Sequence, residues 1–382
     1  MNILFITDIA PFPVYGGERL RTYGLLKVLT KIFDKVVAVT GTTKNKSYSK
    51  AQFKSIDFYE FDFDTLLSQN RYINYLKKFR KDKKLCELLK KLLENNNIDI
   101  AYIDYHYYGQ YINFFKSKGI PTIYGTHNVQ SKLLYQRPTY TLKNKLSNFL
   151  EYSVYQLHER YFFKKANAII AVSENDRQYY KNYIQASKIF VIPNFLIEED
   201  YSLDDLNKKD YIIMTANFFT YANIAGLEWF VKNIWNNEIF KNEKLLLVGI
   251  GSDIVLEELK KKQIYSNNIK AIGSVDDLKP YIAQAKISIV PLLHGSGTRL
   301  KCIEAMALKT QLLSTGKGAE GVEHEGTIII ADTPELFTQN LKTILDGKID
   351  YTQKGYDIFM KIYSLEPNIS IFRKIIQKIT SE

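Results

Sequence analysis

Residues 290–307, VPLLHGSGTRLKCIEAMA, are the most informative segment of the chain. An apolar strand runs into a loop of small residues, and the loop opens a helix that carries Arg299, Lys301 and Glu304. Loop amides and a helix N-terminus suit a diphosphate, to which the two cations could add charge-assisted bonds. An ionised glutamate only accepts hydrogen bonds and so suits the two hydroxyls of a ribose. A capped surface helix with ordinary charge pairs is the simpler interpretation, but it leaves this convergence unexplained.

Short apolar runs alternate with amphipathic helical stretches on both sides of this segment, a pattern typical of parallel α/β architecture. In the first half we predict strands at Asn2–Thr7, Lys35–Thr40, Ser55–Phe61, Ile98–Ile103, Pro121–Thr126, Ala168–Val172 and Ile189–Pro193. Helices are predicted between them at Glu18–Lys31, Thr65–Glu94, Leu142–Lys165 and Glu174–Tyr183.

A polar segment, Glu198–Asp210, interrupts the apolar pattern and is predicted to link two domains. Beyond it we predict strands at Tyr211–Thr215, Lys244–Val248, Ile269–Ile272, Ile287–Pro291, Gln311–Ser314 and Thr327–Ile330. Helices are predicted near Ile224–Ile234, Asp253–Lys262, Asp276–Gln284, Arg299–Leu308, Pro334–Asp346, Thr352–Tyr363 and Pro367–Thr380. We therefore place two domains at residues 1–197 and 198–363, with a last helix, about 364–382, packing back on the first.

Length and composition agree with two globular domains. The 382 residues are too many for one ordinary core and fit two domains of about 150–200 residues. No apolar run approaches the roughly 20 residues that cross a bilayer. The N-terminus lacks the basic region of a signal peptide, and the two cysteines, Cys86 and Cys302, are far apart. We therefore expect a reduced cytoplasmic protein.

The net charge of +11 is unevenly distributed. Residues 1–195 hold 30 Lys/Arg and 16 Asp/Glu, a balance of +14, whereas residues 196–382 hold 22 and 25, a balance of −3. Such an excess indicates an anionic partner (a lipid headgroup, a phosphorylated acceptor or a nucleic acid) or simply a solvated basic face. The run 77–84 is either an interfacial helix or a solvated one, and helix Leu142–Lys165 is predicted to be mainly core-facing, with a charged edge that could help dock a membrane.

Two further features lie where open α/β sheets place ligands. Gly16 and Gly17 stand between the first strand and the first helix, where paired glycines let the backbone approach an anion. His127 follows an apolar strand and could donate to a sugar hydroxyl, although a lone histidine is more often structural. The GxGxxG fingerprint is absent and no acidic residue ends the second strand, so NAD binding is disfavoured.

Other common chemistries find no support in the sequence. Asp62-Phe63-Asp64 resembles a metal-binding DxD. It lies, however, in a stretch where polar and apolar residues alternate strictly, which is typical of a half-buried edge strand. The histidines have no ligand spacing, neither cysteine sits in a CxxC, and no GxxxxGK[ST] loop exists. We therefore predict no metal site and no ATP hydrolysis.

The run GSGTRLKCIEAMALKTQLLSTGKGAEGV, residues 295–322, resembles the donor-site segment of the retaining glycosyltransferases of family 4. The stretches PVYGGERLRTYGLLKVL, GTHNVQS, KKANAIIAVSENDRQYY, VIPNF, LLLVGIGS and IKAIGSVDDLKPYIAQAKISIVPL are similar to the family in order and spacing. The resemblance covers nearly the whole chain. It implies the α/β GT-B fold, in which two Rossmann-like domains face each other across a cleft that binds a nucleotide-sugar.

The resemblance also assigns roles. It implies that His127, Arg299 and Lys301 are the catalytic residues, His127 contacting the sugar. It implies donor contacts from Gly16, Gly17, Asn217, Gly249, Gly251, Val275, Gly295, Ser296, Gly297, Thr298 and Glu304, the last of which would hold the ribose. The chain departs from the family twice: Ser296 replaces a glutamate of the paired-glutamate motif, and segment 216–223 lacks the Arg and Lys of many relatives. Arg299 and Lys301 would then have to pair with the diphosphate in place of that Arg and Lys.

The function that follows is transfer of a sugar, with retention, from a UDP- or GDP-linked donor to a hydroxyl of a cell-surface glycan or glycolipid. No cofactor, no metal and no nucleic-acid partner is expected. The basic N-terminal half would receive a glycan or lipid-linked acceptor, in the cytoplasm or peripherally on the inner membrane face. Two alternatives stay open, a nucleotide-sugar epimerase of the same fold and a non-catalytic basic binding protein.

Overall fold

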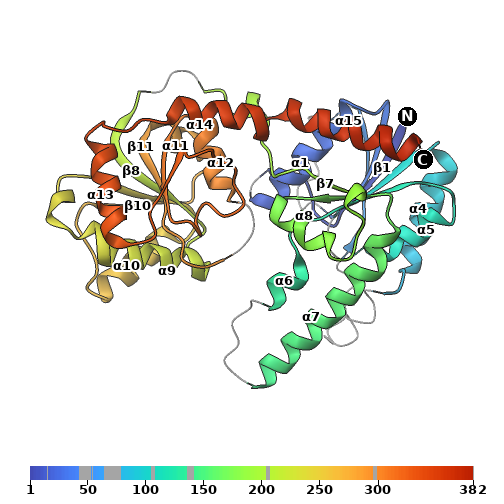
Figure 1. Cartoon of the computed structure of the whole chain (residues 1–382), viewed down its shortest axis with the longest axis horizontal. Coiled ribbons are helices and arrows are strands. Elements are labelled where there is room, and N and C mark those ends of the chain that lie inside the picture. Colours follow the sequence, from blue (N-terminus) through green and yellow to red (C-terminus); the bar gives the residue numbers. More distant parts are fainter. Residues whose placement is uncertain are drawn as a thin grey trace. The chain divides into compact units, whose positions relative to one another are not determined.

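The computed structural model describes residues 1–14, 16–42, 53, 55–63, 79–104, 108–135, 142–203, 207–295 and 299–381 (Figure 1). The chain divides into two compact units, Met1–Asn194 with Leu365–Glu382, and Phe195–Ser364. Each unit is built on a parallel sheet with helices, so the predicted α/β class is confirmed.

The first unit contains a seven-stranded parallel sheet in the order β3-β2-β1-β4-β5-β6-β7. Its strands are β1 Asn2–Ile6, β2 Lys35–Thr40, β3 Ile56–Glu60, β4 Ile100–Asp104, β5 Thr122–Gly125, β6 Ala168–Ala171 and β7 Ile189–Val191. All seven were expected: the five inner strands, covered on both faces, appear as continuous apolar runs, whereas the edge strand β3 alternates polar with apolar residues. The helices described in this unit are α1 Gly17–Thr30, α4 Lys83–Asn95, α5 Ile112–Lys116, α6 Gln130–Tyr135, α7 Leu142–Phe162, α8 Glu174–Lys181 and α15 Leu365–Ser381.

Helix α15 is the C-terminal part of the chain, and it belongs to the first unit. It packs beside α1, and its Phe372 ring lies 5.9 Å from the ring of Tyr102 on β4. The last helix is therefore part of the first unit's core.

Two helix predictions in the first unit were wrong. The single helix expected over Thr65–Glu94 does not continue through residues 79–82, since Asp82 caps α4 by accepting a hydrogen bond from the Leu85 amide at 3.0 Å; residues 64–78 lie outside the described part. The apolar residues of α7 that were expected to face the core are Leu146, Phe149, Leu150, Val154, Leu157 and Tyr161, but Val154 is only partly buried and the other five side chains are exposed. The face that it buries carries Tyr155, His158, Glu159 and Phe162 instead.

The second unit contains a six-stranded parallel sheet in the order β10-β9-β8-β11-β12-β13. Its strands are β8 Lys209–Thr215, β9 Leu245–Val248, β10 Ile269–Gly273, β11 Ala285–Val290, β12 Gln311–Ser314 and β13 Ile328–Ile330. Its α-helices among the described residues are α9 Tyr221–Phe230, α10 Ser252–Lys261, α11 Lys279–Gln284, α12 Leu300–Ala307, α13 Pro334–Leu345 and α14 Thr352–Ile358. A short π-helix extends α9 through Val231–Trp235, and another extends α14 through Phe359–Tyr363.

The polar segment 198–210 is not the free linker that we expected. Residues Glu198–Tyr201 form a 3₁₀ turn against α12, with the Tyr201 side chain buried, and Lys209 and Asp210 already belong to β8. The segment therefore lies inside the second unit, anchored by one aromatic ring among polar residues.

Each sheet reverses its strand order at one place, between β1 and β4 in the first and between β8 and β11 in the second. Open parallel sheets bind ligands beyond the carboxyl ends of the strands at such a switch point. Within the described ranges, no helix combines the length and apolar composition needed to traverse a bilayer.

Candidate functional site

Glycines bring the loops after β8 and β9 together next to the switch point of the second sheet. Gly249 has a φ of +134°, and a Cβ atom built on it would lie 2.0 Å from the carbonyl oxygen of Ala216. Its amide donates to the carbonyl of Gly273 at 2.8 Å. Gly251, with a φ of +78°, then caps the N-terminus of α10. Close backbone approaches that only glycine permits therefore form much of this part of the carboxyl end of the sheet.

Lys301, on the first turn of α12, reaches the carboxyl end of β8. Its Nζ donates to the Thr215 carbonyl at 2.9 Å and to Asn223 Oδ1 at 3.3 Å. Asn223 Nδ2 in turn donates to the carbonyl of Asn217 at 2.9 Å. Burial lowers the pKa of Lys301 to about 8. A desolvated ammonium group is thus fixed beside the loop that follows β8.

Arg299 caps α12 and folds against the loop that precedes it. Its Nε donates to the Lys317 carbonyl at 3.4 Å. A Cβ atom on Gly295, whose φ is +104°, would lie 3.1 Å from the Arg299 guanidinium, so glycine permits this approach. Burial lowers the pKa of Arg299. The predicted loop residues Ser296, Gly297 and Thr298 lie outside the described part of the chain.

Glu304 is held by a residue that the sequence analysis did not identify. Tyr201 Oη donates to Glu304 Oε1 at 3.0 Å from the 3₁₀ turn described above. Burial raises the pKa of Glu304, and the bond from Tyr201 and the charge of Lys301 oppose that rise. The sequence feature that could have revealed Tyr201 is its position as an aromatic residue within a polar run.

The second unit thus gathers most of the predicted donor-binding residues on the loops and helices of one sheet edge. They are Asn217, Gly249, Gly251, Gly295, Arg299, Lys301 and Glu304. Val275 follows β10 at the same edge with a partly buried side chain.

The first unit carries the remaining predicted residues. Gly16, with a φ of +79°, caps α1 and Gly17 is its first residue. Arg19 holds the preceding loop, because its Nη1 donates to the carbonyl of Phe12 at 3.1 Å and to that of Pro13 at 3.3 Å. The helix N-terminus is therefore presented by a fixed loop.

His127 is paired with a buried carboxylate. Its Nε2 lies 2.8 Å from Oδ2 of Asp104, which ends β4 and is fully buried. Nearby, Tyr108 Oη donates to Asp8 Oδ2 at 3.2 Å, and burial raises the pKa of Asp8 to about 7. Neither aspartate was predicted as a site residue. The pairing orients the histidine ring at the carboxyl end of the first sheet.

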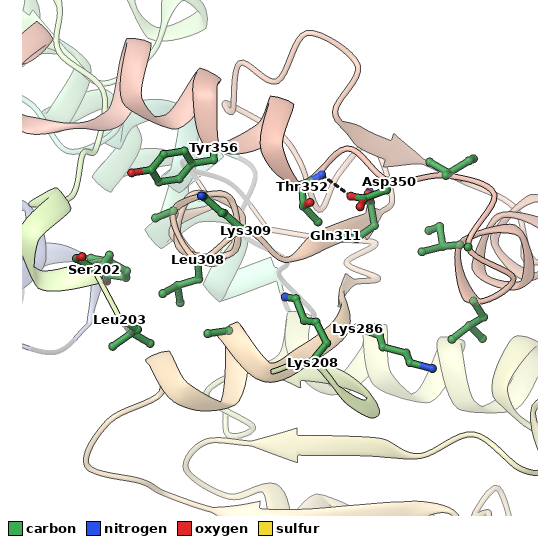
Figure 2. A pocket seen from close by; sticks show the side chains of 17 residues that line it. Ser202, Leu203, Lys208, Lys286, Leu308, Lys309, Gln311, Asp350, Thr352 and Tyr356 are labelled. Carbon is green, nitrogen blue, oxygen red and sulfur yellow. Dashed lines mark hydrogen bonds between the residues drawn. The ribbon is translucent and has the colours of Figure 1, made fainter. Parts of the chain in front are cut away.

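A cavity of about 690 Å³ opens at the other end of the second sheet (Figure 2). It lies among residues that begin β11 and β12, and Lys208 and Lys286 are among the side chains that line it. Asp350 accepts a hydrogen bond from the Thr352 amide at 2.9 Å on its wall. Because it lies at the amino ends of the strands, this cavity is not the predicted donor site.

Across the described ranges, no group of three or more His, Cys, Asp or Glu side chains could hold a metal ion. The Asp62-Phe63-Asp64 motif was expected in an edge strand, but β3 ends at Glu60 and Asp62 and Phe63 follow it, while Asp64 falls outside those ranges.

A buried carboxyl group joins three helices of the first unit. Glu159 on α7 accepts a hydrogen bond from Ser131 Oγ at 2.6 Å, and Ser131 Oγ lies 2.9 Å from Tyr179 Oη. Burial raises the pKa of Glu159 to about 7, against the bonds from Ser131. A carboxyl group with a raised pKa favours folding most at low pH, and this contribution disappears as the pH rises through about 7.

We expect Glu159→Gln to make the stability of the first unit less dependent on pH. At pH 8 the variant should gain about 3 kcal/mol in its free energy of unfolding over the native chain, and at pH 4 almost none. Urea unfolding followed by circular dichroism at both pH values measures the difference. A gain of equal size at the two pH values would contradict the raised pKa of Glu159.

Models of two protein families match the chain, one in each half. Residues 61–199 match the model described as Glycosyltransferase Family 4, and residues 209–347 match Glycosyl transferases group 1. A Klebsiella pneumoniae protein described as an uncharacterized 44.6 kDa protein in cps region is 30% identical over 173 residues. That match covers 40% of this chain and 45% of the relative.

Solved structures match in fold over nearly the whole chain. A glycosyltransferase from Rickettsia africae ESF-5 aligns with a TM-score of 0.69 at 15% identity, covering 99% of this chain and 98% of the other. Anabaena Alr3699/HepE in complex with UDP aligns with a TM-score of 0.68 at 13% identity over the full length of both. Residues 61–199 and 209–347 are therefore glycosyltransferase domains of family 4 and group 1, in a chain whose fold is that of the GT-B glycosyltransferases.

Proposed function

We propose that the chain transfers a sugar from a nucleotide diphosphate donor, linked to UDP or GDP, to a hydroxyl of a cell-surface glycan or glycolipid, with retention of configuration. The observation that carries the proposal is the grouping of Arg299, Lys301 and Glu304 with glycine loops at the switch point of the second sheet. The Anabaena HepE structures, solved with UDP, with UDP and glucose and with UDP-glucose, support a uridine donor.

The chemistry required is stabilisation of a leaving diphosphate as the sugar acquires oxocarbenium character. Arg299, Lys301 and nearby loop amides would supply this stabilisation from a partly desolvated position, where a charge acts more strongly than in water. In this proposal these groups, rather than a metal ion or a cofactor, neutralise the diphosphate. Glu304, with one oxygen bound by Tyr201, would accept hydrogen bonds from the ribose hydroxyls.

The sugar itself would be oriented by His127, whose ring is fixed by Asp104. No described side chain is assigned as a covalent nucleophile. The proposed route is therefore attack by the acceptor hydroxyl on the face from which the diphosphate leaves, with the proton passing to that diphosphate.

The acceptor is proposed to bind the N-terminal domain, where residues 1–195 carry a balance of +14. A lipid-linked or phosphorylated saccharide would complement this charge. The proposed location is the cytoplasm, peripherally at the inner membrane face.

A thermal-shift panel of UDP-, GDP- and ADP-sugars tests the donor proposal, because a ligand that binds only the folded state raises Tm. We expect one nucleotide class to raise Tm and the matching nucleotide diphosphate to compete with it. If none does, the proposed function is wrong. Conversion of the donor to an epimer without any acceptor would also contradict it.

A further inference from the structure

Helix α7 of the first unit buries one face, and large apolar side chains lie on the opposite, exposed face. The exposed fractions on the other face are Leu146 62%, Phe149 59%, Leu150 42%, Leu157 62% and Tyr161 56%. At about 100° per residue these five side chains share an arc of roughly 120°. Single exposed leucines are ordinary, but five large apolar side chains exposed within one arc of a helix, with Ser153, Arg160 and Lys164 among them, mark an interaction surface. We call these five residues the α7 ridge; Figure 1 shows that α7 extends well beyond the first sheet.

A cavity of about 190 Å³ adjoins the ridge between α6, α7 and α8. It is lined by Lys132, Tyr135, Tyr152, Gln156, Arg160, Tyr179, Asn182 and Tyr183. The Tyr152 ring links it to the ridge, at 6.3 Å from the ring of Phe149 and 5.5 Å from that of Tyr135. Tyrosines with an apolar body and a polar tip, beside Lys132 and Arg160, suit the boundary between hydrocarbon and phosphate.

The charges around the ridge select one kind of partner. Exposed cations accompany it at Lys145, Arg160 and Lys164, whereas Glu159 is buried with Ser131 on the opposite face. A second copy of this chain, docked by a two-fold axis, would bring these cations against one another. An anionic lipid surface would instead attract them while accepting the apolar side chains.

We propose that the α7 ridge and the adjoining tyrosine-lined cavity dock the chain on an anionic bilayer. The ridge enters the boundary between headgroups and acyl chains, and Lys132 and Arg160 contact lipid phosphates. The purpose of this surface rests on the proposed function, in which the N-terminal domain receives a lipid-linked acceptor. Its binding to lipid can be measured without any transfer reaction.

Flotation with vesicles of phosphatidylcholine, alone or mixed with phosphatidylglycerol, tests the ridge. The variant Leu146→Gln/Phe149→Gln/Leu157→Gln should lose about 100-fold in partition coefficient on the mixed vesicles, since three large apolar side chains no longer insert. The matched control is Ile239→Gln/Ile254→Gln/Leu336→Gln, which changes three exposed apolar residues of the second unit and should bind as the native chain does.

The cavity is tested by a second pair of variants. Lys132→Gln/Arg160→Gln should lose roughly 25-fold on the mixed vesicles and most of the salt dependence, since each cation near an anionic surface contributes about fivefold. Lys260→Gln/Lys261→Gln, on α10 of the second unit, is the control and should bind normally.

Three results would overturn the proposal. They are native affinity of the ridge variant for the mixed vesicles, equal binding of the native chain to both kinds of vesicle, and a concentration-dependent dimer that the ridge variant abolishes. A nucleotide-sugar thermal shift on the same samples keeps the two proposals apart. If the ridge variant loses vesicle binding but keeps the native thermal shift, the result bears on the α7 ridge alone. If the native chain shows no thermal shift, the result bears on the proposed donor site alone.

Discussion

Lys301→Met is expected to lower the turnover of sugar transfer by about a thousandfold. This is the upper end of the effect expected when one preorganised group that stabilises a leaving group is removed. Methionine keeps the length and the apolar stem of lysine, so the packing of α12 should persist. What disappears is the ammonium group held at 2.9 Å from the Thr215 carbonyl, at the edge where the diphosphate is proposed to bind. Because burial lowers the pKa of Lys301 to about 8, the native turnover should also fall as the pH rises through that value.

Steady-state kinetics on the native chain and the variant measure this effect. The control is Lys309→Met, which removes a cation just beyond the other end of α12, where Lys309 lies over the Tyr356 ring. The control should stay within about threefold of the native turnover, as expected for an exposed side chain away from the chemistry. Equal turnover in Lys301→Met and the native chain would remove Lys301 from the mechanism.

Gly249→Ala is expected to lower the free energy of unfolding of the second unit by about 3–5 kcal/mol, through a backbone clash added to conformational strain. A Cβ atom at Gly249 meets the Ala216 carbonyl oxygen at 2.0 Å, and the φ of +134° is unfavourable for alanine. The loops after β8 and β9 would have to separate, which would also open the proposed diphosphate site.

Gly273→Ala separates the two causes, because Gly273 also has a positive φ, +85°, but a Cβ atom there would have no neighbour within 4 Å. It should cost about 1 kcal/mol from the backbone alone. Both tryptophans of the chain, Trp229 and Trp235, lie in the second unit, so urea unfolding followed by their fluorescence reports on that unit. Equal losses in the two variants would show that the close approach at Gly249 is not what stabilises the edge.

Most of the fold followed from the sequence because both sheets are parallel. Strands such as Lys35–Thr40 and Gln311–Ser314 are buried on both sides, so their apolar runs stand out from the helices between them. The short helices α5 and α6 were missed, since five or six residues are too few to show a helical period. The orientation of α7 was also wrong, because the face that it buries carries His158 and Glu159, while its large apolar side chains are exposed.

The candidate site was predictable only where its residues share one segment. The grouping of Arg299, Lys301 and Glu304 could be predicted because a single loop and helix carry them. Tyr201 contacts Glu304 across 103 positions of sequence, and Asp104 contacts His127 across 23, so neither pairing has a local signal. Such partners come from different elements that only the folded sheet brings together.

The most direct test of the account is the affinity of the chain for nucleotide diphosphates that differ in their ribose hydroxyls, measured by titration calorimetry. With UDP and 2′,3′-dideoxy-UDP, or the guanine pair if the panel selects guanine, we expect the native chain to prefer the intact ribose by about 100-fold, because a buried carboxylate would otherwise lose two hydrogen bonds. Glu304→Ala should bind both compounds equally and weakly. Should the native chain not distinguish them, or the variant retain the full preference, Glu304 does not hold the ribose and the donor site lies elsewhere.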